Sequence, residues 1–209
     1  KCIDIAVDYM NSHKPDGLII LGDRFEIVGF AQAAKVLNIP IFHIAGGDTS
    51  LGSLDNLFRD IISICSSLHF AKLPKHKKKI ENLGIDKENI FITGSLSNDN
   101  FNFFKSQPKK NVKDIIGKKI KLKFAMVSFH PVTKPFHVFD NDIDELLNTL
   151  EKFKNIHFIF TSSNQDPMGI LFNKKIKEFV FKNSSHTEFI PNLGLINYFT
   201  MLSSASFMI

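Results

Sequence analysis

Short apolar runs alternate with helical patterns along the whole 209-residue chain, and this alternation limits the fold more than any other feature. Glycine, proline or polar residues bound most of the apolar runs, as expected of buried strands. The expected strands are 17–21, 41–44, 68–71, 90–93, 124–129, 157–160, 188–190 and 206–209, and the expected helices are 3–10, 25–37, 54–67, 75–82, 142–153, 170–181 and 193–202. Strands that alternate with helices form βαβ units and parallel sheets, so the sequence predicts an α/β fold.

The alternation weakens after Asn98, where the polar, proline-containing stretch 106–111 is the best candidate for a linker. A second α/β series follows this stretch. We therefore expect two Rossmann-like domains with parallel sheets, 1–107 and 108–209. Because the chain opens inside a helical pattern without a methionine and closes on an apolar strand, we expect both domains to be incomplete.

Composition argues against several classes of protein. A hydrophobic content of 44% fits an ordinary globular core, and no apolar run is long enough to cross a bilayer. Cys2 and Cys65 lack metal or redox spacing, which favours reduced thiols and a cytoplasmic location. The net charge of +5 comes from scattered lysines apart from the run 75–79. That run lacks arginines and interleaved aromatics, so a solvated helix face is favoured over a nucleic-acid patch.

Polar clusters follow directly on four of the expected strands. They are Gly22-Asp23-Arg24-Phe25-Glu26, Gly46-Gly47-Asp48, His130-Pro131-Val132-Thr133 and Ser163-Asn164-Gln165-Asp166. In an open α/β sheet, ligands bind outside the carboxyl ends of the strands. We therefore expect the four clusters to line a single crevice.

Arg24 and Arg59 are the only arginines among 26 basic residues, and both belong to these polar segments rather than to the lysine-rich stretches. Where lysine is the usual cation, an arginine suggests planar, bidentate donation to a phosphate or a carboxylate. Two chance arginines are the alternative interpretation.

Two interpretations stay open for the carboxylates of the first expected domain. Asp23 can cap the helix that follows it, or act as an acid, a base or a ligand of a substrate hydroxyl. Glu26 has the spacing of a capping box, which indicates a structural role. Asp55 and Arg59 lie four residues apart on one helix face, either as an ordinary ion pair or as a pair that faces the crevice.

The other clusters are also open to a structural and a functional interpretation. Gly46 and Gly47 allow either the close approach of a ligand or a tight turn. His130 ends a strand and precedes a loop, where an imidazole can donate to a diphosphate. Asn164 and Asp166 can bind a ribose or sugar hydroxyl, although a polar turn is the safer interpretation.

Six segments in this order resemble the hydrolysing UDP-N-acetylglucosamine 2-epimerases of sialic-acid and legionaminic-acid biosynthesis. They are 22–26, 43–48, 54–59, 93–94, 130–133 and 164–166. The resemblance implies two Rossmann-like domains of the glycosyltransferase-B type and a UDP- or GDP-linked N-acetylated hexosamine as substrate. It implies anti-elimination of the nucleoside diphosphate across C1–C2, followed by addition of water to give a free mannosamine-type sugar. It also implies that no metal or redox cofactor is needed, and a homodimer or higher oligomer.

The resemblance assigns roles to particular residues. Asp23 and Asp55 match family carboxylates near the sugar, and Arg59 and His130 match substrate and phosphate contacts. We add Arg24, Gly46, Gly47, Asn164 and Asp166 as expected substrate- or nucleotide-binding residues.

Two positions depart from the family pattern. Ala45 stands where the family usually has an acidic residue or a histidine, and Asp60 where it usually has a histidine. Either Asp48, three residues after Ala45, acts as the catalytic substitute, or the chain is a catalytically impaired sugar-nucleotide-binding relic. A glycosyltransferase of the same fold is the third alternative, because a fold does not fix a reaction.

Overall fold

The computed structural model describes residues 2–108, 110–117, 120, 123–131, 141–163 and 167–209. They form two compact units, residues 1–98 and 99–209, and each unit contains one parallel four-stranded sheet. The predicted α/β class with two Rossmann-like parts is confirmed. The boundary between the units falls within one helix, α5 (Leu96–Ser106). The boundary predicted after residue 107 lies just beyond this helix and stays a prediction.

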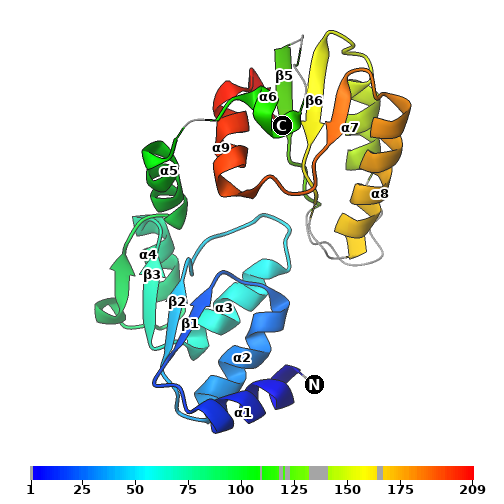
Figure 1. The fold of residues 1–209 in the computed structure, drawn as a ribbon. Helices are drawn as coiled ribbons and strands as arrows, with labels where there is room; N and C mark the ends of the chain where they lie inside the picture. The colour runs from blue at the N-terminus through cyan, green and yellow to red at the C-terminus, as the bar shows by residue number, and fades with distance from the viewer. Residues whose placement is uncertain (1, 109, 118–119, 121–122, 132–140, 164–166) are drawn as a thin grey trace. The chain divides into compact units, whose positions relative to one another are not determined.

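The first unit is a βα series in which each strand pairs with the next one along the chain (Figure 1). Its strands are β1 (Leu18–Leu21), β2 (Ile41–Ile44), β3 (Leu68–Ala71) and β4 (Ile90–Ile92), and its helices are α1 (Cys2–His13), α2 (Phe25–Val36), α3 (Asp55–Cys65), α4 (Pro74–Glu81) and the short 3-10 helix η1 (Lys87–Asn89). The sheet order β1-β2-β3-β4 advances in one direction only.

Helices of the first unit pack on one face of its sheet. Ile20 and Ile41 of this face form a core with α1, α2 and the Ile62 side chain of α3, and Ala71 and Ile90 seat α4. Right-handed crossovers between strands that advance in one direction place the connecting helices on the same side. The winding of the chain therefore explains why the helices gather there.

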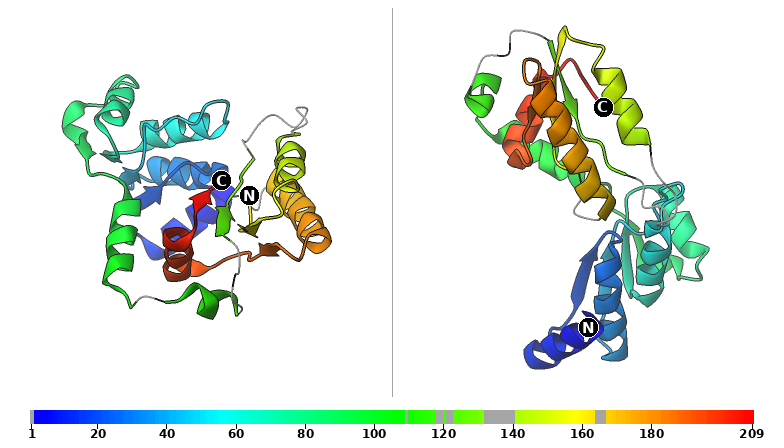
Figure 2. Two further views of the ribbon diagram at one scale, coloured as in Figure 1. Left: turned by 90° about the horizontal axis from the view of Figure 1, so that it is seen from above. Right: turned by 90° about the vertical axis from the view of Figure 1, so that its right-hand side faces the viewer.

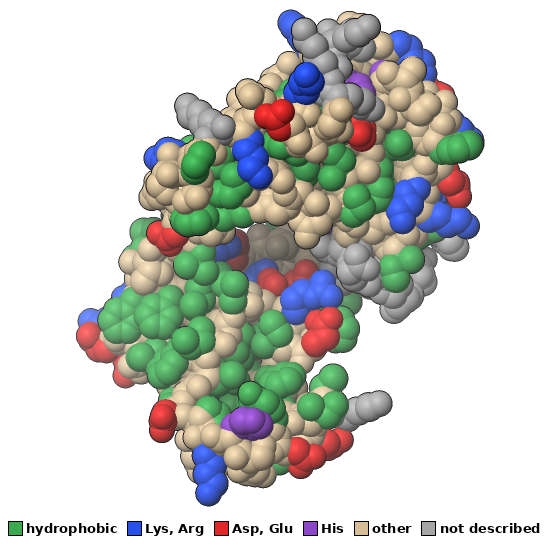
Figure 3. Space-filling model, in the orientation of Figure 1, with side chains coloured by type: hydrophobic (Ala, Val, Ile, Leu, Met, Phe, Trp, Pro, Cys, Tyr) green, Lys and Arg blue, Asp and Glu red, His purple; other side chains and the backbone are tan. Residues whose placement is uncertain are grey.

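The opposite face of the first sheet is apolar but only half-buried or exposed. Its side chains, in register across the four strands, are Ile19, Leu21, Phe42, Ile44, Leu68, Phe70 and Phe91. Ile19 is 68% exposed and Phe91 is 47% exposed. Within the described part of the chain, the core clusters include no side chain from this face. Figure 3 shows hydrophobic side chains gathered on the surface of this unit.

The second unit has the sheet order β7-β6-β5-β8, so its chain reverses direction once. Its elements after α5 are α6 (Val112–Ile116), β5 (Lys123–Val127), α7 (Asp142–Leu150), β6 (Ile156–Phe160), α8 (Pro167–Lys182), β7 (Thr187–Phe189), α9 (Gly194–Ser204) and β8 (Phe207–Met208). The reversal leaves a topological switch point between β5 and β8, where open α/β sheets bind ligands at the carboxyl ends of the strands.

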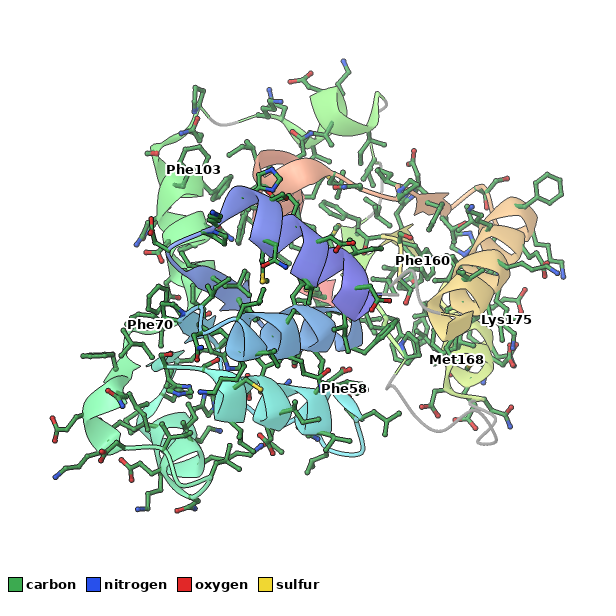
Figure 4. The ribbon with its side chains drawn as sticks, turned by 90° about the horizontal axis from the view of Figure 1, so that it is seen from below. Phe58, Phe70, Phe103, Phe160, Met168 and Lys175 are labelled. Atoms are coloured by element: carbon green, nitrogen blue, oxygen red, sulfur yellow. The ribbon has the colours of Figure 1, made fainter. Side chains whose placement is uncertain are left out.

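Both faces of the second sheet are covered. On one face α7 and α8 pack against Phe158 and Phe160, and on the other α6 and α9 pack against Met126 and Ile159. The view from above in Figure 2 shows α8 and α9 on opposite sides of the strands. Figure 4 labels Phe160 on β6 and Met168 on the helix α8 that covers it. The second unit therefore has the complete layering expected of a parallel sheet.

The helices and strands predicted from the sequence are confirmed, with ends that differ by at most three residues. The helices α5 and α6 were missed. The segment of α5, rich in Asn, Ser and Asp, has weak intrinsic helix propensity. Its Phe101 and Phe104 rings contact Phe199 of α9 at centroid distances of 5.7 and 5.4 Å. Packing within the second unit thus supports a helix that local sequence does not indicate.

Candidate functional site

Arg59 is the centre of a polar site at the carboxyl ends of β1 and β2. It lies on the buried face of α3, with only 4% of its surface exposed. Its Nη2 donates to a carboxylate oxygen of Asp23, which follows β1. Its Nη1 donates to the backbone carbonyl of Asp48, at 2.8 Å, and to Asn56 Oδ1, at 3.0 Å. The guanidinium therefore joins the turn after β1 to the loop after β2.

Asp23 does not cap α2, so the capping interpretation is wrong. The residue at the N-cap position is Arg24, and its side chain makes no capping hydrogen bond. The predicted capping box is also wrong, because Glu26 accepts hydrogen bonds from Arg24, at 3.0 Å from Nη2. The carboxylate of Asp23 is turned towards Arg59 instead. The proposed binding role of Arg24, which is exposed on the surface, stays a prediction.

Asp55 is the first residue of α3, one turn before Arg59, as the spacing predicted. The Ser53 hydroxyl donates to Asp55 Oδ2 at 2.9 Å and accepts from the Asp55 backbone N–H at 3.1 Å. A carboxylate at a helix N-terminus interacts favourably with the helix dipole. Asp55 therefore has a fixed position at the start of the helix that carries Arg59.

Asp48 is an ionised carboxylate held by the β3–α4 segment. Its carboxylate lies 3.0 Å from Lys72 Nζ and 3.5 Å from His76 Nε2. Burial alone would raise the pKa of Asp48, but the hydrogen bonds from Lys72 and the Thr49 N–H and the nearby positive charge outweigh burial and lower it. A carboxylate with a lowered pKa is a weak base. The proposed catalytic role of Asp48 stays a prediction, beside a clear structural role.

Gly46 and Gly47 are packed tightly against the protein itself. A Cβ atom on Gly46 would lie 2.9 Å from both His43 Nδ1 and Ser63 Oγ. Gly47 has a φ of +75°, and a Cβ there would lie 2.2 Å from the backbone oxygen of His76 in α4. Only glycine fits these two positions without a shift of neighbouring atoms. The geometry favours the tight-turn interpretation, and nucleotide binding by this loop stays a prediction.

The two departures from the family pattern lie beside this site. Ala45 has a φ of +67°, in the left-handed region, and turns the chain out of β2. Asp60 neighbours Arg59 on α3, and its Oδ1 lies 3.3 Å from Lys79 Nζ. A methyl group and an ion-paired carboxylate thus occupy the positions where the family resemblance implies side chains that can carry a proton.

The lysine run 75–79 is not a uniformly solvated helix face, which corrects that interpretation. Lys77 Nζ donates to the backbone oxygen of Ile90 at 2.8 Å, and Lys79 Nζ donates to that of Asp48 at 3.1 Å. His76 of the same helix is buried. His76, Lys77 and Lys79 therefore bond to groups of their own unit, and His76 and Lys79 also lie next to the carboxylates of Asp48 and Asp60. In this way α4 contributes to the polar site.

In the second unit, His130 follows β5 beside the switch point. It is exposed, and its Nδ1 lies 3.4 Å from Oγ of Ser163, which follows β6. The loops after two neighbouring strands therefore meet at His130, as the strand ends predicted. Val132, Thr133, Asn164, Gln165 and Asp166 lie outside the described residues, and their roles stay predictions. The single crevice expected from the four polar clusters also stays a prediction, because two of the clusters belong to each unit.

Sequence reasoning missed His43, a fully buried residue of β2 that hydrogen-bonds to the turn after β1 and to α3. The available sign was a polar residue within the otherwise apolar strand 41–44. Cys2 and Cys65 are both free thiols. Among the residues with described positions, no group of three or more His, Cys, Asp or Glu side chains could hold a metal ion, and no helix is long and apolar enough to cross a membrane.

Comparison with known proteins shows to which family the chain belongs. A family profile described as UDP-N-acetylglucosamine 2-epimerase matches residues 2–209, and the chain belongs to this family. It is 33% identical over 205 residues to the GDP/UDP-N,N'-diacetylbacillosamine 2-epimerase (hydrolyzing) of Campylobacter jejuni, and the match covers 97% of this chain and 53% of the relative. It is 35% identical over 179 residues to polysialic acid biosynthesis protein P7 of Escherichia coli, covering 85% of this chain and 46% of the relative. The chain thus spans about half the length of these curated relatives.

Solved structures show the same fold. The UDP-GlcNAc 2-epimerase of Neisseria meningitidis, bound to UDP-GlcNAc, matches with a TM-score of 0.77 at 16% identity, over 99% of this chain and 57% of that one. The Methanocaldococcus jannaschii UDP-GlcNAc 2-epimerase, in complex with UDP-GlcNAc and UDP, matches with a TM-score of 0.76 at 18% identity, over 99% of this chain and 58% of that one. The predicted fold type and family are confirmed.

Proposed function

We propose that this chain is part of a hydrolysing sugar-nucleotide 2-epimerase. The observation that carries the proposal is the Asp23–Arg59 pair at the carboxyl end of β1, with Asp55 one helical turn away on α3. Carboxylates and a guanidinium are the groups that this reaction requires next to a sugar diphosphate. Membership of the 2-epimerase family supports the same reaction.

The reaction has two steps. In the first, a base removes the proton from C2 of the sugar while the C1–oxygen bond breaks, and the nucleoside diphosphate leaves with the bonding electrons. In the second, the oxygen of water adds to C1 of the resulting glycal, and a proton returns to the opposite face of C2. The product is a free mannosamine-type sugar. We assign proton transfer to Asp23 and Asp55, with Asp48 as a further candidate, and stabilisation of the departing diphosphate to Arg59 and His130.

The substrate is a UDP- or GDP-linked N-acetylated hexosamine. UDP-N-acetylglucosamine and the UDP- and GDP-linked diacetylbacillosamines are the first compounds to test, because the names of relatives contain these sugars. Arg24, Gly46, Gly47, Asn164 and Asp166 are the further candidates for substrate and nucleotide contacts. We also propose a cytoplasmic location and a homodimer or higher oligomer, which light scattering of the purified protein would test.

The test uses the full-length protein that contains this chain, incubated with each nucleotide sugar in D2O. We expect release of the nucleoside diphosphate and a free 2-epimeric sugar that carries one deuterium at C2. Simple hydrolysis without deuterium at C2 would refute the elimination step. Nucleotide binding without turnover would indicate the relic, and transfer to an acceptor sugar would indicate a glycosyltransferase.

Asp23→Asn tests the central assignment. An asparagine keeps an oxygen that can accept from Arg59 but cannot exchange a proton, so we expect turnover to fall by about 100-fold or more with nucleotide binding retained. Asp8→Asn, an exposed carboxylate on α1, is the matched control and should leave turnover unchanged. Undiminished turnover in Asp23→Asn would remove Asp23 from the mechanism.

A further inference from the structure

His43 occupies a buried position between the two elements that carry the Asp23–Arg59 pair. Its Nε2 lies 2.8 Å from the carbonyl oxygen of Gly22, and its Nδ1 lies 3.0 Å from Ser63 Oγ. A carbonyl oxygen only accepts hydrogen bonds, so Nε2 carries the proton and Nδ1 accepts from the Ser63 hydroxyl. The two neighbours therefore select one neutral tautomer of the ring.

The surroundings of the ring favour this neutral form. Burial lowers the pKa of His43, and the positive charge of Arg59 adds to the effect. The hydrogen bond to the Gly22 carbonyl and the charges of Asp23 and Asp60 raise the pKa of His43, but they do not reverse the effect of burial. The neighbouring ring of His69 on β3, at a centroid distance of 6.4 Å, is also neutral at neutral pH, since burial lowers its pKa to about 4.

Both hydrogen bonds of His43 end next to a residue of the candidate site. Gly22 directly precedes Asp23, has a φ of +83°, and donates its N–H to the Ile44 carbonyl at 3.0 Å. Its peptide groups are thus held by β2 on both sides. Ser63 lies four residues after Arg59, on the same face of α3. His43 therefore connects the turn that presents the carboxylate to the helix that presents the guanidinium.

The loop after β2 is packed onto this connection. The Gly46 backbone lies against His43 Nδ1 and Ser63 Oγ so closely that a Cβ would be 2.9 Å from each atom. Rotation of the ring or withdrawal of α3 would therefore disturb three segments at once.

We propose that His43 is a positioning residue, whose Nε2–H bond to Gly22 fixes the turn that brings the Asp23 carboxylate to Arg59 and to the substrate. The proposal rests on the proposed function for its kinetic consequences. The hydrogen-bond pattern itself is independent of the reaction.

Two substitutions in the full-length protein separate the two hydrogen bonds. The amide of His43→Gln reaches the place of Nε2 and can still donate to Gly22. The amide of His43→Asn reaches only the place of Nδ1 and can bond Ser63 alone. We expect kcat to fall by about 100-fold in His43→Asn, because small displacements of catalytic groups have effects of this size. In His43→Gln we expect a loss of no more than about tenfold, because one neutral hydrogen bond is lost.

The matched control is His69→Gln, a fully buried histidine beside His43 on the same sheet face. It should lower thermal stability but leave kcat of the folded protein unchanged. Equal kcat in His43→Gln and His43→Asn, at matched folded fractions, would overturn the positioning role.

A measurement that needs no turnover completes the test. Ring ¹⁵N spectra of histidine-labelled wild-type protein should show His43 as the neutral Nε2–H tautomer at neutral pH, assigned through its loss in His43→Gln. A charged ring or the Nδ1–H tautomer would refute the proposal. Failure of the proposed function would appear differently, as wild-type protein that releases no nucleoside diphosphate while the ring spectrum stays as expected.

Discussion

The two units contain sheets of the same size and direction, yet they differ in how many faces are covered. In the first unit the strand order advances one way, and the helices lie on one face. In the second the chain reverses after β7, and helices lie on both. Within the described residues, the direction of the crossovers therefore agrees with which faces of each sheet the helices cover.

The units also differ in what lies buried near the carboxyl ends of their strands. The first unit encloses Arg59 and His43 and satisfies them with internal hydrogen bonds. In the second, His130 follows β5 and is exposed. The site of the first unit is therefore set in place by its own fold, which makes it the more sensitive to substitution.

The largest expected difference in the loss of stability is between alanine substitutions of two phenylalanines. Phe160 of β6 is fully buried beneath α8, so Phe160→Ala should lower the stability of the second unit by about 3–5 kcal/mol. Phe91 lies on the uncovered face and is 47% exposed, so Phe91→Ala should cost the first unit only about 1 kcal/mol. Hydrogen exchange resolved by unit measures both. Equal losses would mean that the uncovered face is covered in solution.

The next contrast compares ion pairs. Arg59→Met leaves Asp23 without its guanidinium in a partly buried site and should destabilise the first unit by about 3 kcal/mol. In the second unit, Lys175 Nζ lies 2.5 Å from Asp144 Oδ2, but the two side chains are 30% and 48% exposed. Lys175→Met breaks this surface pair and should lower stability by less than about 0.5 kcal/mol. Urea unfolding followed in each unit tests the difference. A similar cost for the two variants would contradict the buried role of Arg59.

Acid should weaken the first unit through His69. Burial lowers the pKa of His69 from its ordinary value of 6.5 to about 4 in the folded protein. Between these values the unfolded chain binds more protons, so stability falls as the pH decreases, by at most about 3.5 kcal/mol in total. Unfolding free energies measured across this pH range should flatten in His69→Gln. They should keep their slope in the control His13→Gln, an exposed residue of α1.

The smallest contrast concerns two glycines with positive φ. Gly47 and Gly194 have φ of +75° and +66°, so alanine is strained at both, by about 1 kcal/mol. A Cβ on Gly47 would also meet the α4 backbone, whereas nothing lies within 4 Å of a Cβ on Gly194. Gly47→Ala should therefore cost about 2 kcal/mol more than Gly194→Ala, as measured by thermal unfolding. Equal melting temperatures would show that α4 moves away easily.

Sequence patterns predicted the elements whose own residues carry the periodicity. The strand 41–44 and the helix of Arg59 were both predicted, because apolar runs and punctuating glycines are local features. The helix α5 was not, since its support comes from Phe199, which lies about a hundred residues further along the chain.

Side-chain partners were harder to predict than elements. Asp23 has a spacing that fits a cap, but its partner Arg59 comes from another helix 36 residues away. Lys79 of α4 is half-buried where its Nζ donates to the backbone carbonyl of Asp48, a partner 31 residues away. A single sequence shows which polar groups are present, whereas the fold decides which of them meet.

The contact between Gly47 and α4 has a mechanical consequence. At Gly47 no side chain separates the loop backbone from the backbone of α4. His76 and Lys79 of α4, and Lys72 just before the helix, also bond to Asp48 of the loop. Loop and helix should therefore move as one rigid piece. Any force that displaces α4 would carry the carboxylate of Asp48 with it, over nearly the same distance and without delay.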